Sequence, residues 1–321
     1  MSAQAEAERH QRERARAAAV TAKAAGALWR QTDTDQLRAS WVALLTRAVA
    51  ITTAGQLTAA RQAEPYLAGL LGPDPEQAAA DQLRPESLAG VAGDGRELPE
   101  LLMFPLYTTL SAIGRGASLA VSWASGAALL DLLVRTVVAD AGRAADLVAM
   151  ATRPAVTSYV RVVELPACAR CIILAGREYS LSDGFARHPR CDCTMAPVTR
   201  SSQPAVVGAR GVFQAMTPEQ QVKAFGAKAV EAIAAGADPA QVVNARRGMK
   251  SATLYRRTVQ ATTEGITRRG LAGQRRRSFE RVDGRRYASA RAVRLMPEEI
   301  MRRAEDREHA VRLLRLHGYL F

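Results

Sequence analysis

The chain has 321 residues and a formal net charge of +13, from 44 lysines and arginines against 31 aspartates and glutamates. Only 5% of the residues are aromatic, so helices packed through small aliphatic side chains are favoured over a β-sandwich. A chain of this length is expected to form two or three structural units, each with its own core.

The positive charge is concentrated in the last quarter of the chain. Residues 241–321 contain 20 basic and 8 acidic side chains, whereas the preceding 240 residues contain 24 basic and 23 acidic ones. A basic region joined to a nearly neutral body is typical of proteins that contact a polyanion. Nucleic acid, an acidic protein surface and a merely solvated face remain as three interpretations.

The N-terminal 153 residues have helical patterns. Residues 2 to about 30 predict a polar helix, and a second helix, capped by Asp33 or Asp35, continues to near Pro65. The sequence "GPDPEQ" at 72–77 is a loop that restarts a helix, with Asp74 as its cap. A glycine-rich loop at 90–100 follows it.

Helical spacing returns from residue 101 to about 153. One apolar stripe is expected to be buried against the earlier helices; it consists of Leu130, Val134, Val137, Ala141, Ala145 and Val148. Asp140, Arg143 and Asp146 lie on the other side of this helix, where we expect an exposed ladder of charges.

The pattern changes at residues 153–165, where valines and a tyrosine predict a strand that leads to Cys168. The sequence after Cys193, "TMAPVTRSSQPAVVG", is typical of a linker. "TPEQQ" at 217–221 predicts a capping box, with Thr217 as the cap, Gln220 reaching back and the helix ending at Gly236. "ADPAQ" at 237–241 predicts another helix start, and residues 296–321 predict a helical hairpin.

All four cysteines and one of four histidines lie between residues 168 and 193. The spacing is Cys168-x2-Cys171, sixteen residues, then His188-x2-Cys191-x-Cys193. Structural zinc takes four nitrogen or sulfur ligands, so one of these five donors is superfluous. Cys168, Cys171 and then Cys191 are the strongest candidates, while His188 and Cys193 compete for the fourth position.

Other interpretations of this cluster remain open. They are a redox pair, buried thiols without a ligand, and a catalytic cysteine with His188 as its base. A redox pair normally opens a helix in a βαβ unit, which the sequence does not predict here. A closed four-donor site has no open position for catalysis, which favours a structural metal.

No catalytic residues can be assigned from the sequence. His10, His309 and His317 lie in predicted helical regions, and no GxSxG motif is present. These observations lean against an enzyme without deciding the question.

A soluble protein of a reducing cytoplasm, without membrane contact, is the expectation from the remaining patterns. The uncharged apolar stretch at 117–130 is too short to span a bilayer, and the first residues lack the apolar core of a secretory signal. Thiols persist in such a compartment.

These patterns together predict a mainly α fold. A helical domain at 1–153 is followed by a small zinc-stabilised α+β module at 154–203. A basic, helical C-terminal region at 204–321 completes the chain, and its arginine-dense segment 256–294 is expected to be flexible, with little regular structure.

Several of these stretches resemble a known family. "CARCIILAGREY" followed by "FARHPRCDC" resembles the cysteine-rich signature of phage Mu F-like head morphogenesis proteins, in the form found in actinobacteriophages and their prophages. The flanking stretches at roughly 130–250 and the closing "LMPEEIMRRA…LLRLHGYLF" at 294–321 are also similar.

The resemblance implies a minor capsid protein of the virion interior that is assembled in the host cytoplasm. It implies partnership with the portal and major capsid proteins in procapsid assembly, DNA packaging or ejection, with the 1–153 domain docking on the portal or capsid. It also implies that Cys168, Cys171, His188, Cys191 and Cys193 form the metal-site motif.

Two alternative functions remain. Members of this group are often labelled capsid maturation proteases, so the chain would then process head proteins. The second alternative is non-specific DNA binding through the arginine-rich C-terminal region, driven by phosphate contacts and weakened by salt.

Overall fold

The computed structural model describes residues 2–182, 193–254, 257–276, 278–281, 283 and 288–320. Contacts divide the chain into two compact units: Met1–Glu164 with Gly176–Val206, and Leu165–Ala175 with Val207–Phe321. The residues of the predicted module at 154–203 fall in both units. Its strands belong to the first unit, and the segment that carries Cys168 and Cys171 belongs to the second.

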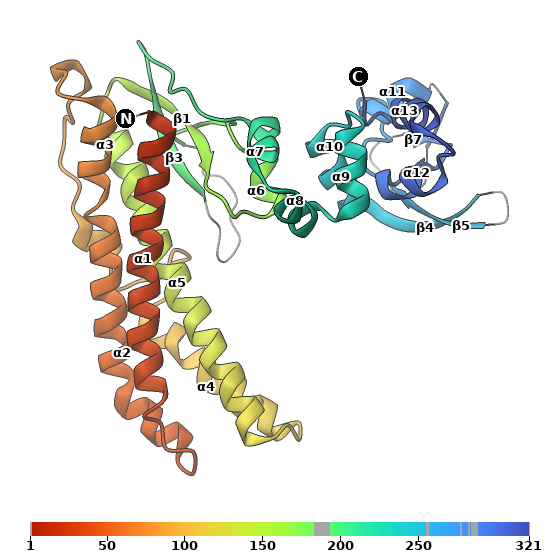
Figure 1. Ribbon diagram of the computed structural model, residues 1–321. Coiled ribbons are helices and arrows are strands. Elements are labelled where there is room, and N and C mark those ends of the chain that lie inside the picture. Colours follow the sequence, from red (N-terminus) through yellow and green to blue (C-terminus); the bar gives the residue numbers. More distant parts are fainter. Residues whose placement is uncertain are drawn as a thin grey trace. The chain divides into compact units, whose positions relative to one another are not determined.

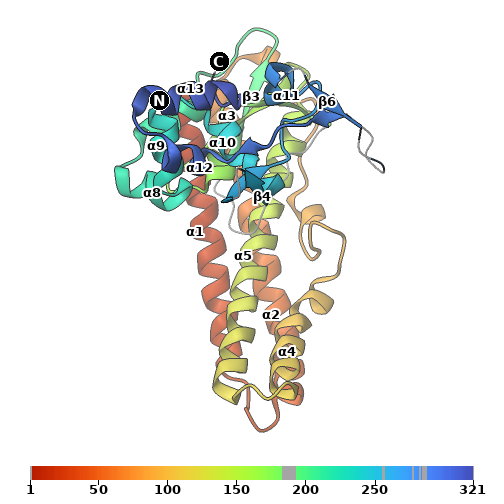
Figure 2. The same cartoon turned by 90° about the vertical axis from the view of Figure 1, so that its right-hand side faces the viewer.

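The first unit is built on long helices (Figures 1 and 2). These are α1 (Ala3–Trp29), α2 (Leu37–Ala60), α3 (Ala63–Leu71), α4 (Leu98–Gly114) and α5 (Leu119–Ala151). Short 3-10 turns, η1 (Pro75–Gln77) and η2 (Pro85–Leu88), lie between α3 and α4. Helices α1, α2 and α4 pack along α5, which is the longest helix described.

Two tryptophans occupy the core of this bundle. Trp29 of α1 and Trp41 of α2 are fully buried, with their ring centroids 4.9 Å apart in an edge-to-face arrangement. Each indole N–H donates to a backbone carbonyl, that of Trp123 for Trp29 and that of Leu102 for Trp41. Buried alanines on α1 and α2 let the helices approach closely, as the composition predicts.

The helical stretch predicted at 101–153 is two helices joined by a tight turn. Gly116 has a φ of +88°, which glycine adopts without strain, and Ser118 caps α5 by accepting from the Val121 N–H. The predicted apolar stripe on α5 is buried except at Val148, which is 41% exposed.

A three-stranded antiparallel sheet completes the first unit. Strand β1 (Val156–Val163) lies between β2 (Glu178–Ser180) and β3 (Cys193–Thr199). Strand β1 confirms the predicted strand, but β3 corrects the predicted linker after Cys193. All seven residues of β3 are buried, and α1 and α5 pack against it, so tertiary burial overrides the local turn-like composition.

The second unit begins with short helices. They are α6 (Ala169–Ile172), α7 (Ala209–Ala215), α8 (Pro218–Phe225), α9 (Ala227–Ala234) and α10 (Pro239–Ala245). The capping box of Thr217 and Gln220 is confirmed, as is the Asp238 cap. The single helix expected up to Gly236 is instead broken at Gly226, whose φ is +85°.

The rest of the second unit mixes strands and helices. The turn η3 (Arg246–Gly248) leads into β4 (Met249–Leu254), β5 (Arg257–Thr262) and the short strand β8 (Arg294–Leu295), which form a sheet in the order β4-β5-β8. Strand β6 (Phe279–Glu280) pairs with β7 (Ser289–Ala290), and α11 (Leu271–Arg276), α12 (Pro297–Arg303) and α13 (Arg307–Leu316) complete it.

These elements change the expectation for the C-terminal region. The closing hairpin of α12 and α13 is confirmed. The segment 256–294 was expected to have little regular structure, yet its described residues include β5, α11 and three short strands. The fold is mainly α, as predicted, with small sheets in both units.

Two helical segments, Leu37–Leu71 and Leu119–Ala151, are long and apolar enough to cross a membrane by length and composition alone. Core helices of water-soluble proteins meet the same criterion, so the observation is weak evidence. Both segments contribute to the bundle core, through Trp41 and Leu130 respectively.

Candidate functional site

The first candidate site is the Cys168-x2-Cys171 pair. Cys168 precedes the single turn of α6, and its carbonyl accepts from the backbone N–H of Cys171 at 3.0 Å. This turn brings the two sulfurs to 3.6 Å from each other. A disulfide would hold them at about 2.05 Å, whereas two thiolates about 2.3 Å from one tetrahedral zinc lie about 3.8 Å apart. The separation is that of a hydrogen bond from the Cys168 thiol to the Cys171 sulfur, and it is also compatible with two ligands of one metal ion.

Of the remaining three predicted ligands, the structure describes only Cys193. His188 and Cys191 lie outside the described residues. Cys193 begins β3 in the first unit, is fully buried, and its sulfur accepts from Arg161 Nη2 at 3.1 Å.

Within the described part of the chain, no group of three or more His, Cys, Asp or Glu side chains gathers closely enough to hold an ion. That part contains three of the five predicted donors, namely Cys168, Cys171 and Cys193. The geometry of the Cys168–Cys171 pair is therefore the structural observation that bears on the metal prediction.

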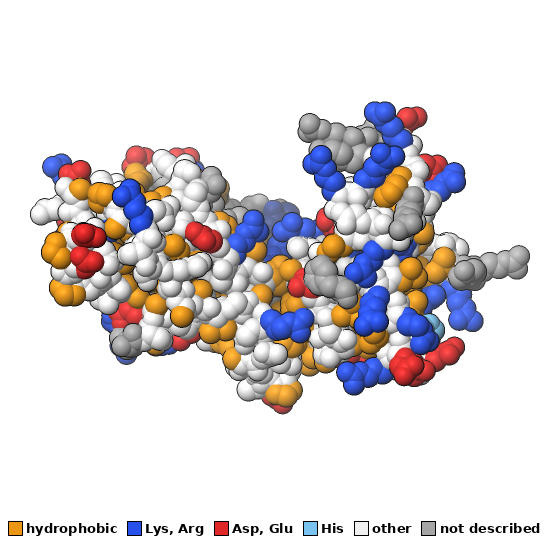
Figure 3. All heavy atoms as spheres, turned by 90° about the horizontal axis from the view of Figure 1, so that it is seen from above, with side chains coloured by type: hydrophobic (Ala, Val, Ile, Leu, Met, Phe, Trp, Pro, Cys, Tyr) orange, Lys and Arg blue, Asp and Glu red, His pale blue; other side chains and the backbone are white. Residues whose placement is uncertain are grey.

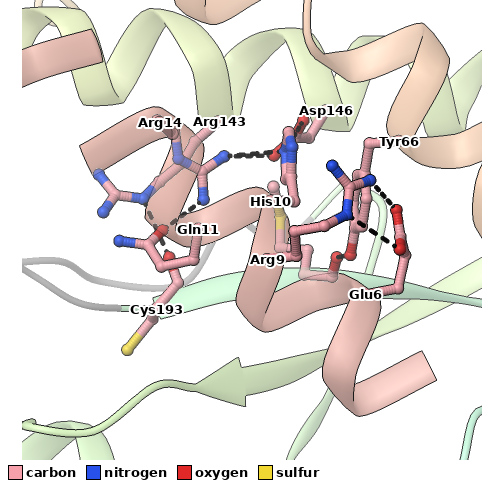
Figure 4. A network of polar contacts seen from close by, with 10 residues as sticks. Glu6, Arg9, His10, Gln11, Arg14, Tyr66, Arg143, Asp146 and Cys193 are labelled. Atoms are coloured by element: carbon pink, nitrogen blue, oxygen red, sulfur yellow. Dashed lines mark hydrogen bonds and ion pairs between the residues drawn. The ribbon is translucent and has the colours of Figure 1, made fainter. Parts of the chain in front are cut away.

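A second constellation is buried in the first unit, between α1 and α5 (Figure 4). His10 Nε2 lies 2.9 Å from Asp146 Oδ1, and Arg14 Nη1 donates to Asp146 Oδ2 at 2.5 Å. Arg14 Nη2 also donates to Gln11 Oε1 at 2.7 Å. The side chains of His10, Arg14 and Asp146 are at most 1% exposed, so this ionic cluster is sealed from solvent.

The cluster extends to α3 and β3. The Tyr66 ring stacks on the His10 ring with the centroids 3.9 Å apart, and its hydroxyl donates to the Met195 carbonyl at 2.5 Å. Arg143, one turn before Asp146, donates to the Cys193 carbonyl at 3.2 Å. These contacts join three helices to the strand that begins at Cys193.

The electrostatics of the cluster follow from burial and from the two side chains that contact Asp146. Burial by itself would raise the pKa of Asp146, but the charges and hydrogen bonds of His10 and Arg14 outweigh it and hold that pKa below its ordinary value. Burial, and then the charge of Asp146, raises the pKa of Tyr66 well above its ordinary value. Asp146 is thus an ionised carboxylate held by the buried Arg14 guanidinium.

The sequence patterns do not predict this cluster. His10 was placed in a polar helix, and Asp146 and Arg143 were expected to be exposed, but they are 0% and 4% exposed. The expectation is wrong because α5 is covered on that side by α1 and β3. The i, i+4 spacing of His10 and Arg14 was a signal, but nothing in the local pattern identifies a partner 132 residues away.

A second buried polar cluster lies in the second unit. Arg294 is 1% exposed and donates to the carbonyls of His317 and Glu264 at 2.8 and 2.7 Å, while its guanidinium lies over the Tyr319 ring. His317 Nδ1 accepts from the Leu295 N–H at 3.1 Å and is also in contact with Arg276 Nη2. Burial, Arg276 and Arg294 lower the pKa of His317 from 6.5 to about 3, so its ring is neutral at pH 7.

We compared the chain with protein-family models, curated proteins and solved structures. No family model matches the chain, and no curated protein or solved structure matches it.

Proposed function

We propose that the chain is a minor capsid protein of a phage or prophage, of the Mu F-like type, with a structural zinc site. In this role it acts with the portal protein in procapsid assembly, DNA packaging or ejection, inside the capsid and, during assembly, in the host cytoplasm. The Cys-x2-Cys…His-x2-Cys-x-Cys signature and the 3.6 Å separation of the Cys168 and Cys171 sulfurs support the proposal.

The proposed zinc ligands are Cys168, Cys171 and Cys191, with His188 or Cys193 as the fourth. A closed site of this type supplies folding energy, because the unfolded chain does not hold the four donors together. The segment around Cys168 has a helix of only four residues, so it gains little from its own hydrogen bonds.

An exposed apolar row on α4 supports docking on another protein. Phe104, Tyr107, Leu110 and Ile113 are each at least 36% exposed and recur every three residues, so they form a strip that winds around about half of the helix. From residue 101 to 130 the sequence carries a single charge, Arg115. Exposed apolar surface of this kind marks protein interfaces, and portal or capsid helices are the proposed partners.

Metal analysis tests the zinc site directly. Purified full-length protein is expected to contain about one zinc per chain, and Cys168→Ser with Cys171→Ser is expected to lose it. Arg170→Ala, which changes the residue between them but no donor, is the matched control. Metal-free wild-type protein whose thermal midpoint does not respond to a chelator would contradict the site.

Copurification with portal protein tests the structural role. Tyr107→Asp is expected to weaken retention by the portal, whereas Ser125→Asp, also exposed but on the outer face of α5, is the control. Cleavage of the major capsid protein on co-expression would instead support the maturation-protease alternative.

A further inference from the structure

Strands β4 and β5 form a two-stranded antiparallel ribbon in the second unit. Six residue pairs run from Met249 opposite Thr262 to Leu254 opposite Arg257. Strand β8 pairs only with Ala261 and Thr262, at the base of the ribbon. Among the described residues the outer part therefore has no further neighbour in the sheet, and Figure 1 shows the ribbon projecting past the nearby helices. Six extended residues span about 20 Å.

The charge on this ribbon is of one sign. Between Arg246 and Thr263 the sequence contains five basic residues and no acidic one. Arg247, Lys250 and Arg257 are exposed, and among the described residues no ion pair joins them to a carboxylate. Figure 3 shows lysine and arginine side chains gathered on the second unit. These three cations are thus available to a partner.

Other arginines of the second unit are committed to the fold. Arg294 is buried, Arg276 donates to the Val293 carbonyl, and Arg246 pairs with Glu298 at 3.1 Å. The arginine content of residues 256–294 therefore overstates the charge that a partner can reach. The ribbon is the better-defined basic surface.

The two faces of the ribbon differ because side chains alternate along a strand. On one face Val259 and Ala261 are buried, and the exposed Lys250 and Arg257 start from this same face, opposite Ala261 and Leu254 respectively. The other face presents small hydrogen-bonding side chains that are all exposed, with Thr253 opposite Thr258 and Ser251 opposite Gln260. Such side chains bond to phosphate oxygens and to base edges.

We propose that the β4–β5 ribbon is a contact arm for double-stranded nucleic acid, in which Arg247, Lys250 and Arg257 bind phosphates and the Ser251–Thr253–Thr258–Gln260 face enters a groove. Strands about 4.8 Å apart fit the major groove of about 12 Å, which admits a two-stranded ribbon. Lys250 lies on β4 and Arg257 on the outer part of β5, so in this proposal their long side chains extend past opposite edges of the ribbon to the two phosphate backbones.

Two other partners fit the described ribbon less well. Binding to single strands relies on aromatic rings that stack on bases, and the described residues 249–254 and 257–262 contain none, while Tyr255 lies outside the described residues. The core of a protein interface is apolar and rich in aromatic residues, whereas the exposed face here is small and polar apart from Met249. A duplex needs only the phosphate contacts and hydrogen bonds that the ribbon offers.

The ribbon proposal does not depend on the proposed role as a capsid protein. It assigns nucleic-acid binding to named residues of the ribbon and not to the basic C-terminal region as a whole. Zinc content and portal retention depend on other residues, so both are expected to be unchanged in ribbon variants. A failure of the ribbon proposal is thereby distinguishable from a failure of the proposed function.

Salt-dependent binding of a mixed-sequence DNA duplex of about 30 base pairs to the full-length protein tests the phosphate contacts. The variant Arg247→Gln/Lys250→Gln/Arg257→Gln is expected to lose at least about tenfold in affinity, and the slope of log affinity against log salt is expected to fall by about three, roughly one per lost phosphate contact. The charge-matched control is Arg210→Gln/Lys223→Gln/Arg307→Gln, which removes three exposed cations elsewhere in the same unit. Equal losses in the two triple variants would overturn the proposal, because they would show a bulk charge effect.

A second pair of variants tests the groove-facing side. Thr253→Glu/Thr258→Glu is expected to abolish duplex binding, while Thr253→Ser/Thr258→Ser, which keeps both hydroxyls, is expected to retain it. Circular dichroism checks that each variant is folded. Tighter binding of single-stranded DNA or of polyglutamate than of the duplex would also overturn the assignment.

Discussion

Asp146 of α5 lies within hydrogen-bond distance of His10 at 2.9 Å, and both side chains are sealed inside the first unit. The same carboxylate accepts from Arg14 at 2.5 Å. One buried anion therefore holds two side chains of α1, and its loss would leave a buried guanidinium without a counter-charge. This relationship makes the junction of α1 and α5 sensitive both to substitution and to acid.

Asp146→Asn is expected to lower the free energy of unfolding by about 3–5 kcal/mol, because it leaves the Arg14 cation buried without an anion. The control is Asp131→Asn, which breaks the more exposed i, i+4 pair with Arg135 on the same helix and is expected to cost less than about 1 kcal/mol. Urea unfolding of both variants measures the difference. Similar costs at the two positions would show that Asp146 does not brace the bundle.

The stability of the protein is expected to fall in acid through Asp146. Its pKa is lowered in the folded state, so the unfolded chain takes up the proton first, and the stabilisation present above about pH 4 is lost as the pH falls through the folded pKa. Thermal midpoints measured between pH 3 and 6 check this dependence. Asp146→Asn is expected to flatten it below about pH 4, and an unchanged profile in that variant would rule out the assignment.

His317 gives a separate pH dependence, at higher pH. Its pKa is lowered from 6.5 to about 3, so between these values the unfolded chain binds a proton that the folded chain does not. Stability is therefore expected to be complete above pH 6.5 and to decline as the pH falls from 6.5 towards 3. His317→Asn keeps an acceptor near the Leu295 N–H and is expected to remove this slope. Titration of the His317 ring by NMR with a midpoint near 6.5 would contradict the prediction.

Gly126 is expected to tolerate no side chain. A Cβ there would lie 2.2 Å from Thr109 Oγ1, 2.6 Å from Trp29 Cζ2 and 2.9 Å from the Pro105 carbonyl oxygen. Gly126→Ala is therefore expected to destabilise the bundle by about 1–3 kcal/mol. Gly114→Ala, where a Cβ would meet nothing within 4 Å, is the matched control and is expected to be neutral or slightly stabilising. Thermal unfolding of the two variants, side by side, distinguishes them.

In the C-terminal half, local sequence patterns predicted the helix starts but not the strands. Thr217 with Gln220 and Asp238 with Pro239 begin helices as predicted, because a cap satisfies backbone N–H groups within three residues of itself. The strands at 249–262 were not predicted. The exposed face of this two-stranded ribbon is polar. Neither strand therefore shows apolar and polar side chains alternating along its whole length, and the residues that pair with each strand lie on the other one.

Of the two candidate sites in this comparison, the cysteine pair was predicted from the sequence and the Asp146 cluster was not. The Cys168-x2-Cys171 spacing predicted a metal-binding turn, and a single turn of helix brings the two sulfurs to 3.6 Å because they are only three residues apart. The burial of Asp146 and Arg143 could not be read from α5, since a polar residue on a helix is expected to face water unless another segment supplies partners.

The sequence by itself determined the helical body, the caps at Thr217 and Asp238, the cysteine signature and the concentration of basic charge from residue 241, because each depends on residues close together in the chain. The predicted cap of α2 at Asp33 or Asp35 is wrong, since Gln36 precedes that helix without a side-chain cap. Only the tertiary structure decided that Asp146 anchors α1, that residues 193–199 form a buried strand, and which arginines of the second unit are buried and which are exposed. The reason is physical: the burial of a charge or of a backbone segment is set by the groups that cover it, and here those groups lie up to 136 residues away.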